Sequence, residues 1–391
     1  MSFAQLTIEE SPRALYVHIP FCKSRCFYCD FTTYVAPTSE MEVYALHLEE
    51  EVRRTAAASD VPLSSVFFGG GTPTRLPSPL LKRLLKSIWT HFDVAADAEV
   101  TMEANPGSVH LEQLKMLRDC GVNRISFGAQ SFSDRLLMTL GRLHDARAIE
   151  QSVSMASQAG FSNVSVDLMF GLPDQHVSDV RESVLRAVST GVQHVSAYWL
   201  KVEDGTPFAR WQSEGNLHLP GEDEEADMYE LVRDLLTSAG FRHYEISNFA
   251  QSGFEARHNL VYWRNQPYFG VGAGAHGWVG DCRLVNVKSL VSYANRIQRG
   301  DMPWDEVNHV SRAEAMETTM MLGLRLAEGV SERDFEERYG LRLDAVFGDV
   351  LRNLESRQWL EKCHGSWRIP HALWPVSNEI VEKFVDVLDV D

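Results

Sequence analysis

The sequence predicts an α/β fold: an incomplete (β/α)6, TIM-like barrel followed by a smaller, mostly helical C-terminal domain. Two observations lead to this expectation. Through the first two hundred residues, six short, apolar, β-rich runs alternate with longer amphipathic stretches, and several of those stretches end in glycine, as helices commonly do. Strands that are apolar almost throughout and alternate with helices form a parallel sheet that is buried on both faces.

The barrel elements follow in order along the chain. We expect strands over residues 14–19, 64–68, 98–102, 123–130, 163–170 and 194–200, and helices over 40–58, 79–92, 111–120, 145–159 and 178–190. Functional side chains collect at the carboxyl ends of the strands in such folds. The informative residues should therefore directly follow each apolar run.

The pattern changes near residue 217. An acidic helix over 221–240 is followed by a strand-like run over 241–250 and an aromatic, glycine-rich stretch, and helical patterns from residue 312 lead to short strand-like runs over 359–363 and 366–370. The last part resembles a winged-helix-like domain. We expect a barrel core over 1–216, a segment that partly closes the barrel over 217–305, and a helical domain over 306–391.

Composition excludes several classes of function. Lys and Arg number 37 against 54 Asp and Glu, a net charge of −17, and so acidic a surface repels phosphate backbones and anionic lipid. We therefore expect no nucleic-acid partner. The N-terminus lacks the basic start and apolar middle of a signal peptide, and no apolar run reaches 18 residues. These features predict a cytoplasmic protein.

Three of the six cysteines form a CxxxCxxC pattern directly after the first strand: Cys22, Cys26 and Cys29. A structural zinc ion usually takes four protein ligands, and Cys120, Cys282 and Cys363 lie singly and far away, so zinc is the weaker interpretation. We expect Cys282 and Cys363 to be buried thiols. A [4Fe-4S] cluster held by three cysteines leaves one iron without a protein ligand. The spacing alone leaves cluster, zinc and chance open.

The second strand ends in the glycine-rich segment FFGGGTPTRL. Together with the cysteine pattern, this segment resembles the radical S-adenosylmethionine (SAM) superfamily. The resemblance implies that the open iron is chelated by the amino and carboxylate groups of SAM. Gly70, Gly71 and Thr72 would then lie against the methionine part of SAM, because a backbone without side chains permits close approach. An ordinary strand-to-helix turn is the alternative.

Polar residues also follow later strands. Arg142 suits the SAM carboxylate through a two-pronged contact, Asp167 and Gln130 suit ribose hydroxyls, and Glu103 could accept from the ammonium or the ribose. Taken singly, each could equally be a structural polar group. Together they resemble the SAM-binding positions of the branch related to oxygen-independent coproporphyrinogen III oxidase, which implies two further residues near the cluster and SAM, Tyr16 and Tyr28.

Within that branch, the sequence is most similar to the HemW heme chaperones. The oxidases carry a fourth cysteine two positions past the third, where this chain has Phe31. The chaperones carry an HNxxYW motif, present here from His258 to Trp263. Neutral imidazole is a good axial ligand for heme iron, and Tyr262 and Trp263 could cover a flat macrocycle. His276, in a glycine-rich stretch, is a second candidate ligand.

The resemblance implies a protein that binds heme through His258 and hands it to an acceptor apoprotein, while a [4Fe-4S] cluster and SAM gate the transfer or support a homodimer. Membrane-bound acceptors fit this expectation. The alternative is a radical SAM enzyme, either a coproporphyrinogen oxidase or a methyltransferase. The missing oxidase cysteine weighs against the first of these without eliminating it.

Overall fold

The computed structural model describes residue 3, residue 6 and residues 10–388. Most of the N-terminal segment on which the signal-peptide argument rests lies outside this part. A nine-stranded sheet in the order β7-β8-β6-β5-β4-β3-β2-β1-β9 forms the body of the molecule. A second, antiparallel sheet has the order β10 (His276–Val279), β11 (Cys282–Asn286) and β12 (Trp304–His309). A third sheet has the order β13-β15-β14.

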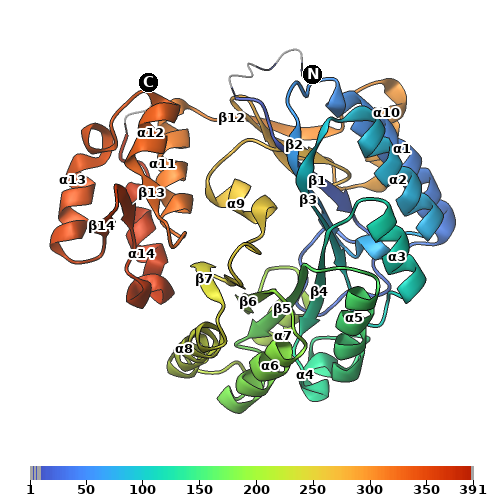
Figure 1. The fold of residues 1–391 in the computed structure, drawn as a ribbon, viewed down its shortest axis with the longest axis horizontal. Helices are drawn as coiled ribbons and strands as arrows, with labels where there is room; N and C mark the ends of the chain where they lie inside the picture. Colours follow the sequence, from blue (N-terminus) through green and yellow to red (C-terminus); the bar gives the residue numbers. More distant parts are fainter. Residues whose placement is uncertain (1–2, 4–5, 7–9, 389–391) are drawn as a thin grey trace.

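Six consecutive strands pair in parallel, each with the next along the chain. They are β1 (Ala14–Ile19), β2 (Leu63–Gly70), β3 (Val94–Ala104), β4 (Arg124–Gln130), β5 (Val164–Phe170) and β6 (His194–Trp199). The connecting helices lie outside the curved sheet (Figure 1): α1 (Thr38–Ala56), α2 (Ser78–His91), α3 (Leu111–Asp119), α5 (Ala146–Gln158) and α6 (Val177–Ser189). This arrangement confirms the predicted incomplete barrel.

The segment after the sixth strand adds to both edges of the sheet. β7 (Arg242–Glu245) and β8 (Asn248–Ala250) form an antiparallel pair beside β6, and β9 (Phe269–Val271) pairs in parallel with β1. The expectation of one strand over 241–250 is therefore wrong. The chain turns back at residues 246–247, and the carbonyl of Ser247 accepts from the amide of Ala197 at 2.7 Å. β6 thereby gains an antiparallel neighbour.

One buried carboxyl group ties helix α1 to this edge segment. Glu51 accepts from the amide of Gly272 at 2.7 Å, from Asn286 Nδ2 at 2.7 Å and from the hydroxyl of Tyr293. Asn286 ends β11 (Cys282–Asn286), and Tyr293 lies in α10 (Leu290–Arg299). Burial raises the pKa of Glu51 to about 7, although these three hydrogen bonds act in the opposite direction. The network joins α1 to the residue after β9, to β11 and to α10.

The C-terminal part is mostly helical and lies to one side of the barrel (Figure 1). Its elements are α11 (Arg312–Gly323), α12 (Glu332–Tyr339), α13 (Leu343–Ser356) and α14 (Ser377–Val381), with the small sheet of β13 (Val330–Ser331), β14 (Glu361–Cys363) and β15 (Ser366–Arg368). The helix α9 (Arg257–Trp263) contacts both β2 and α11. None of the described helices combines the length and the apolar composition needed to cross a membrane.

Candidate functional site

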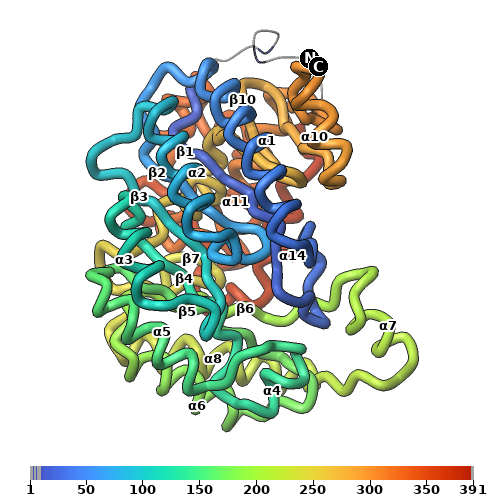
Figure 2. The backbone as a smooth tube through the Cα atoms, turned by 90° about the vertical axis from the view of Figure 1, so that its right-hand side faces the viewer, coloured from blue at the N-terminus to red at the C-terminus, as the bar shows by residue number. Residues whose placement is uncertain are grey.

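The cysteine-bearing loop between β1 and α1 is held at its base and at its tip. At the base, the Cys22 amide donates to the Tyr34 carbonyl at 2.9 Å. At the tip, the Phe27 amide donates to Leu140 at 3.1 Å, and the Phe27 carbonyl accepts from the Phe208 amide at 3.1 Å. Leu140 directly follows α4 (Asp134–Thr139), and Phe208 lies in α7 (Pro207–Ser213). Both helices lie at the end of the molecule opposite α10 (Figure 2).

Beside this loop lies a small apolar cluster, separate from the main core. We call it the loop core; its buried members are Leu136, Leu140, Leu172, Leu200 and Phe208. The rings of Phe27, Tyr28 and Trp211 pack against it, and the Phe27 and Trp211 centroids are 5.1 Å apart. Aromatic side chains therefore lie behind the cysteine loop. They would shield from water an iron–sulfur cluster held by the cysteines.

The number of thiols in this loop bears on what they could hold. The side chains of Cys22, Cys26 and Cys29 are half-buried and form no disulfide. A structural zinc ion usually takes four protein ligands, and this loop supplies three. A four-iron cluster held by three thiolates keeps one iron open for an outside ligand, so the donor set fits the cluster better than a single ion.

The glycine-rich turn at the end of β2 lies so close to the cysteine loop that a side chain on Gly71 would not fit. A Cβ atom on Gly71 would lie 3.0 Å from Cys22 Sγ and 2.9 Å from the Phe21 backbone. Gly70 has a φ of 111°, a conformation that favours glycine. Thr72 Oγ1 lies 3.7 Å from Cys22 Sγ and accepts from Asn105 Nδ2 at 2.7 Å. The turn therefore brings bare backbone to the cysteine loop.

Arg142 lies in the segment after α4, and its side chain reaches the cysteine loop. Its guanidinium donates to Cys26 Sγ at 3.4 Å, to the Gly128 carbonyl at 2.7 Å and to Asn105 Oδ1 at 2.5 Å. Its Nε is buried and has no hydrogen-bond partner among the described residues. A buried donor of this kind favours an anionic ligand such as a carboxylate.

Asn105 was not anticipated from the sequence. It lies two residues after Glu103 in the segment EANPG, just past the end of β3, and it joins Thr72 to Arg142. Its position after an apolar run was the same signal that identified Glu103.

Two carboxyl groups lie in β3 and β5. Glu103 is the last residue but one of β3, whereas Asp167 lies in the middle of β5, so the expectation that Asp167 follows its strand is wrong. Burial, and then the nearby charge of Asp167, raise the pKa of Glu103 to about 8. Burial also raises the pKa of Asp167, which accepts from Ser126 Oγ at 3.1 Å. Gln130, at the end of β4, has a φ of 65° where the pairing with β5 shifts register. Such strain is common where a side chain is directed into a functional site.

His258, on α9, is buried with both ring nitrogens engaged. Its Nδ1 lies 2.9 Å from Ser65 Oγ and its Nε2 lies 2.8 Å from the Tyr262 hydroxyl. The amides of Arg257 and His258 both donate to the Glu99 carboxylate at 3.1 Å. Burial lowers the pKa of His258 to about 3, so the ring is neutral. Ser65 and Glu99 were not identified from the sequence, because they lie in β2 and β3, 193 and 159 residues before His258.

A row of aromatic rings joins His258 to the SAM side of the barrel. Phe67 stacks against His258 with centroids 5.3 Å apart and against Tyr16 with centroids 6.2 Å apart. The rings of Tyr262 and Tyr268 meet edge to face at 4.7 Å. The two groups of residues predicted separately from the sequence, for SAM and for heme, therefore line one barrel interior.

Four further predicted residues lie away from these contacts or have a polar atom that is unpaired within the described part of the chain. Trp263 Nε1 is buried and has no hydrogen-bond partner among the described residues. His276 is exposed at the start of β10 (His276–Val279). Cys282 is buried as expected, but Cys363 is half-buried, so that expectation is wrong: Cys363 ends the short strand β14 and faces His364 Nδ1 at 3.0 Å.

Known proteins resemble this chain along almost its whole length. The radical SAM superfamily model matches residues 16–187, and the HemN C-terminal domain model matches residues 310–372. The heme chaperone HemW of Bacillus subtilis (strain 168) is 40% identical over 378 residues, which cover 96% of this chain and 100% of that protein. The chain belongs to the HemW family of the radical SAM superfamily. HemW of Escherichia coli (strain K12) is 34% identical over 97% of this chain and 99% of its own length.

The HemW family assignment confirms the resemblance seen in the motifs and gives the chain a [4Fe-4S] cluster and SAM as cofactors. The solved structure of coproporphyrinogen III oxidase HemN from Escherichia coli, described as a radical SAM enzyme, has a TM-score of 0.83 at 22% identity. The match covers 97% of this chain and 91% of that one, which confirms the fold class. Cys22, Cys26 and Cys29 would hold the cluster, and its fourth iron would bind SAM beside Arg142.

Replacing Arg142 with lysine is expected to weaken SAM binding about tenfold, because lysine keeps the charge but loses the planar fork that pairs with a carboxylate. Equilibrium dialysis of the reconstituted protein with labelled SAM measures this loss, and iron content confirms that the cluster is intact. Arg135→Lys is the matched control, since Arg135 is exposed and pairs with Asp179 at 2.9 Å. Equal SAM affinity in both variants would contradict the assignment.

Proposed function

We propose that this protein is a heme chaperone: it binds heme and transfers it to an acceptor apoprotein, and it carries a SAM-ligated [4Fe-4S] cluster. Relatives named heme chaperone HemW match it from end to end, at 33–40% identity in bacteria as distant as Bacillus subtilis and Haemophilus influenzae. The observation that carries the proposal is the position of α9. The helix bears the HNxxYW motif between the barrel and the C-terminal domain.

In this proposal, heme iron is bound by His258 Nε2, and Tyr262 and Trp263 lie against the macrocycle. The imidazole is neutral, as a ligand to iron must be. Its Nε2 is engaged by the Tyr262 hydroxyl at 2.8 Å. Binding therefore requires the Tyr262 hydroxyl to move away from Nε2.

The acceptors are apoproteins, including membrane-bound ones. With a net charge of −17, the chain would meet a membrane-bound acceptor through that protein and not through anionic lipid. All six cysteines are free thiols, which supports a reducing, cytoplasmic location.

A homodimer is part of the proposal. Three apolar side chains near the cysteine loop are largely exposed: Phe31 at 63%, Met138 at 70% and Leu143 at 64%. The segments that carry them are joined by the hydrogen bond between Phe27 and Leu140. A second copy of this chain would cover them. Sedimentation of the reconstituted protein should give a dimer that Phe31→Ser weakens, and a monomeric wild type would contradict this.

Heme transfer tests the proposed function directly. The reconstituted protein is loaded anaerobically with one equivalent of hemin, separated from free hemin and mixed with an apoglobin, and the Soret band is followed. We expect one heme per chain and a shift to the globin spectrum that is complete at equimolar acceptor. A failure to bind hemin stoichiometrically, or heme that never leaves, would overturn the proposal.

A radical SAM enzyme is the second candidate, favoured by the contact of Arg142 with Cys26 and by the buried Nε of the same guanidinium, which is unpaired among the residues described. Reduced, reconstituted protein is incubated with SAM and coproporphyrinogen III, and protoporphyrinogen is sought. We expect none, because Phe31 occupies the position where the oxidases carry a fourth cysteine. Turnover that requires Cys26 would establish the enzyme instead.

A further inference from the structure

A second group of metal-binding side chains lies at the far end of the antiparallel sheet, away from the barrel interior. Cys282 begins β11, Asp281 precedes it in the turn from β10, and His309 ends β12 (Trp304–His309). Cys282 Sγ lies 3.3 Å from His309 Nδ1 and 3.3 Å from Asp281 Oδ1. His309 Nδ1 lies 3.2 Å from Asp281 Oδ2.

We propose that Asp281, Cys282 and His309 bind one divalent transition-metal ion of the zinc class. Thiolate, imidazole and carboxylate are the ligand types that zinc takes in proteins. Bonds of about 2.0–2.3 Å in a tetrahedron place neighbouring ligand atoms about 3.3–3.8 Å apart. The three distances of 3.2–3.3 Å are close to this range, so the ligand atoms need to move little to receive an ion.

The backbone of the antiparallel sheet brings these three residues together without an ion. Cys282 and His309 stand directly opposite each other in the β11–β12 ladder, and Cys282 also pairs with Val279 across the hairpin. The carbonyl of Asp281 accepts from the amide of Val310 at 2.8 Å. The thiol is anchored in the buried core, whereas the side chains of His309 and Asp281 are 71% and 45% exposed. An ion would thus enter from solvent.

Hydrogen bonding among the three groups is the competing explanation for their closeness. An exposed pair such as His309 and Asp281 contributes little to stability, so it does not by itself explain the arrangement. Cys363 and His364 form a second cysteine–histidine pair, whose sulfur and Nδ1 lie 3.0 Å apart. No carboxylate completes a group of three there among the described residues. That pair is adjacent in sequence, so its closeness is local. Cys282 and His309 are brought together by the sheet across 27 residues.

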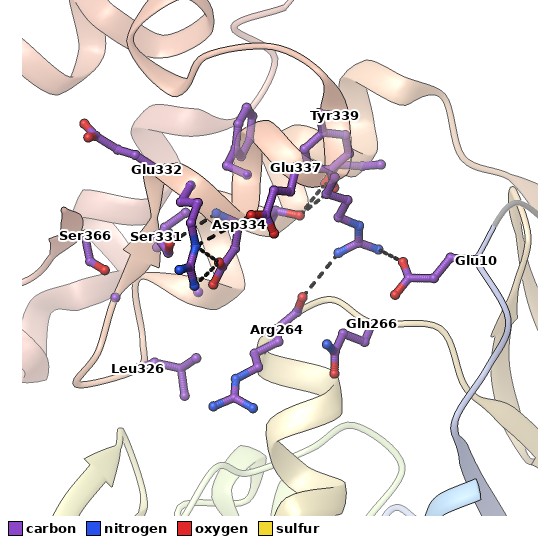
Figure 3. Close-up of a pocket in the computed structure, with 18 of the residues that line it drawn as sticks. Glu10, Arg264, Gln266, Leu326, Ser331, Glu332, Asp334, Glu337, Tyr339 and Ser366 are labelled. Carbon is purple, nitrogen blue, oxygen red and sulfur yellow. Dashed lines mark hydrogen bonds and ion pairs between the residues drawn. The ribbon is translucent and has the colours of Figure 1, made fainter. Parts of the chain in front are cut away.

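The position of the site suggests what the ion would do. His309 is followed by Val310 and by Ser311, whose hydroxyl caps the first helix of the C-terminal domain by accepting from the Glu314 amide at 3.1 Å. Asp281, Val310 and Ser311 also line a cleft of about 1630 Å³. Figure 3 shows this cleft between residues of the C-terminal domain, such as Asp334, and Arg264 and Gln266, which follow α9. A bound ion would fix the junction at the edge of this cleft. Three protein ligands leave the fourth position to water or to an outside donor.

Zinc binding to the cluster-loaded protein tests the proposal. The protein is dialysed anaerobically against buffered Zn²⁺, and zinc and iron are counted per chain by mass spectrometry. We expect one zinc ion per chain at full iron content, and a zinc affinity roughly 100-fold lower in His309→Gln and in Cys282→Ser. Cys363→Ser is the matched control and should bind zinc as the wild type does.

Two further measurements keep the result unambiguous. His309 is exposed, so His309→Gln should fold normally, and far-UV circular dichroism checks both variants. Zinc X-ray absorption should show one sulfur neighbour at about 2.3 Å with lighter neighbours at about 2.0–2.2 Å. No zinc in the wild type, or equal zinc in the wild type and both variants, would overturn the proposal. Neither result depends on whether the protein transfers heme.

Discussion

Cys26→Ser is expected to abolish the [4Fe-4S] cluster. Three thiolates are the smallest set that holds such a cube with one open iron, and a serine hydroxyl is a much poorer ligand at neutral pH. Iron and acid-labile sulfide, counted after anaerobic reconstitution, should fall from about four of each per chain to near zero. SAM binding should be lost with the cluster, because its chelating iron is gone.

Cys120→Ser is the matched control for this loss. Cys120 is also a half-buried free thiol, but it lies beside Met116, where its sulfur is 3.8 Å from the methionine sulfur. Its replacement should leave iron, sulfide and SAM binding unchanged. Full iron content in Cys26→Ser would show that the cluster is held elsewhere and would remove the basis of the SAM site.

His258→Ala is expected to abolish stoichiometric heme binding and to remove the Soret spectrum of a histidine-ligated heme. The substitution also costs stability, about 2–4 kcal/mol, because it opens a cavity in the barrel and leaves Ser65 and Tyr262 without their partner. A loss of heme binding in this variant alone could therefore reflect the weakened fold. Denaturant unfolding of the variant measures that cost.

Tyr262→Phe separates the two explanations. It keeps the imidazole but removes the hydroxyl that engages Nε2 at 2.8 Å. Without that competing hydrogen bond, worth about 1 kcal/mol, heme should bind with equal or up to about tenfold higher affinity, although the fold is slightly less stable. If His258→Ala keeps the wild-type stoichiometry and spectrum, His258 is not the ligand, and His276→Ala is the next variant to titrate.

Much of the barrel could be predicted because its signals are local. An apolar, β-rich run between amphipathic stretches predicts a strand, and parallel strands bring their carboxyl ends to one edge. For this reason Glu103 and Gln130, at the ends of β3 and β4, could be singled out from the order of residues along the chain. The cysteine spacing is equally local, since it depends on one loop.

Other elements depend on contacts that no local window contains. The helix α9 has seven residues and no side-chain cap from its own segment. Its first amides are capped by Glu99, which is 159 residues away from His258. The partner of His258 in β2, Ser65, is 193 residues away. Neither the helix nor the burial of its histidine could be inferred from the motif, although the motif itself could be recognised.

The loop core is separate from the main core, and this separation affects the order in which the protein folds and receives its cluster. Because Leu136, Leu140 and Phe208 pack with the cysteine loop and not with the main core, we expect that region to open as its own cooperative unit. The barrel can reach its native state while the loop still opens and closes, which gives a cluster donor access to the thiols after folding. Amide exchange should then be fast in residues 22–31 before the metal arrives and slow afterwards, with the strands of the sheet protected throughout.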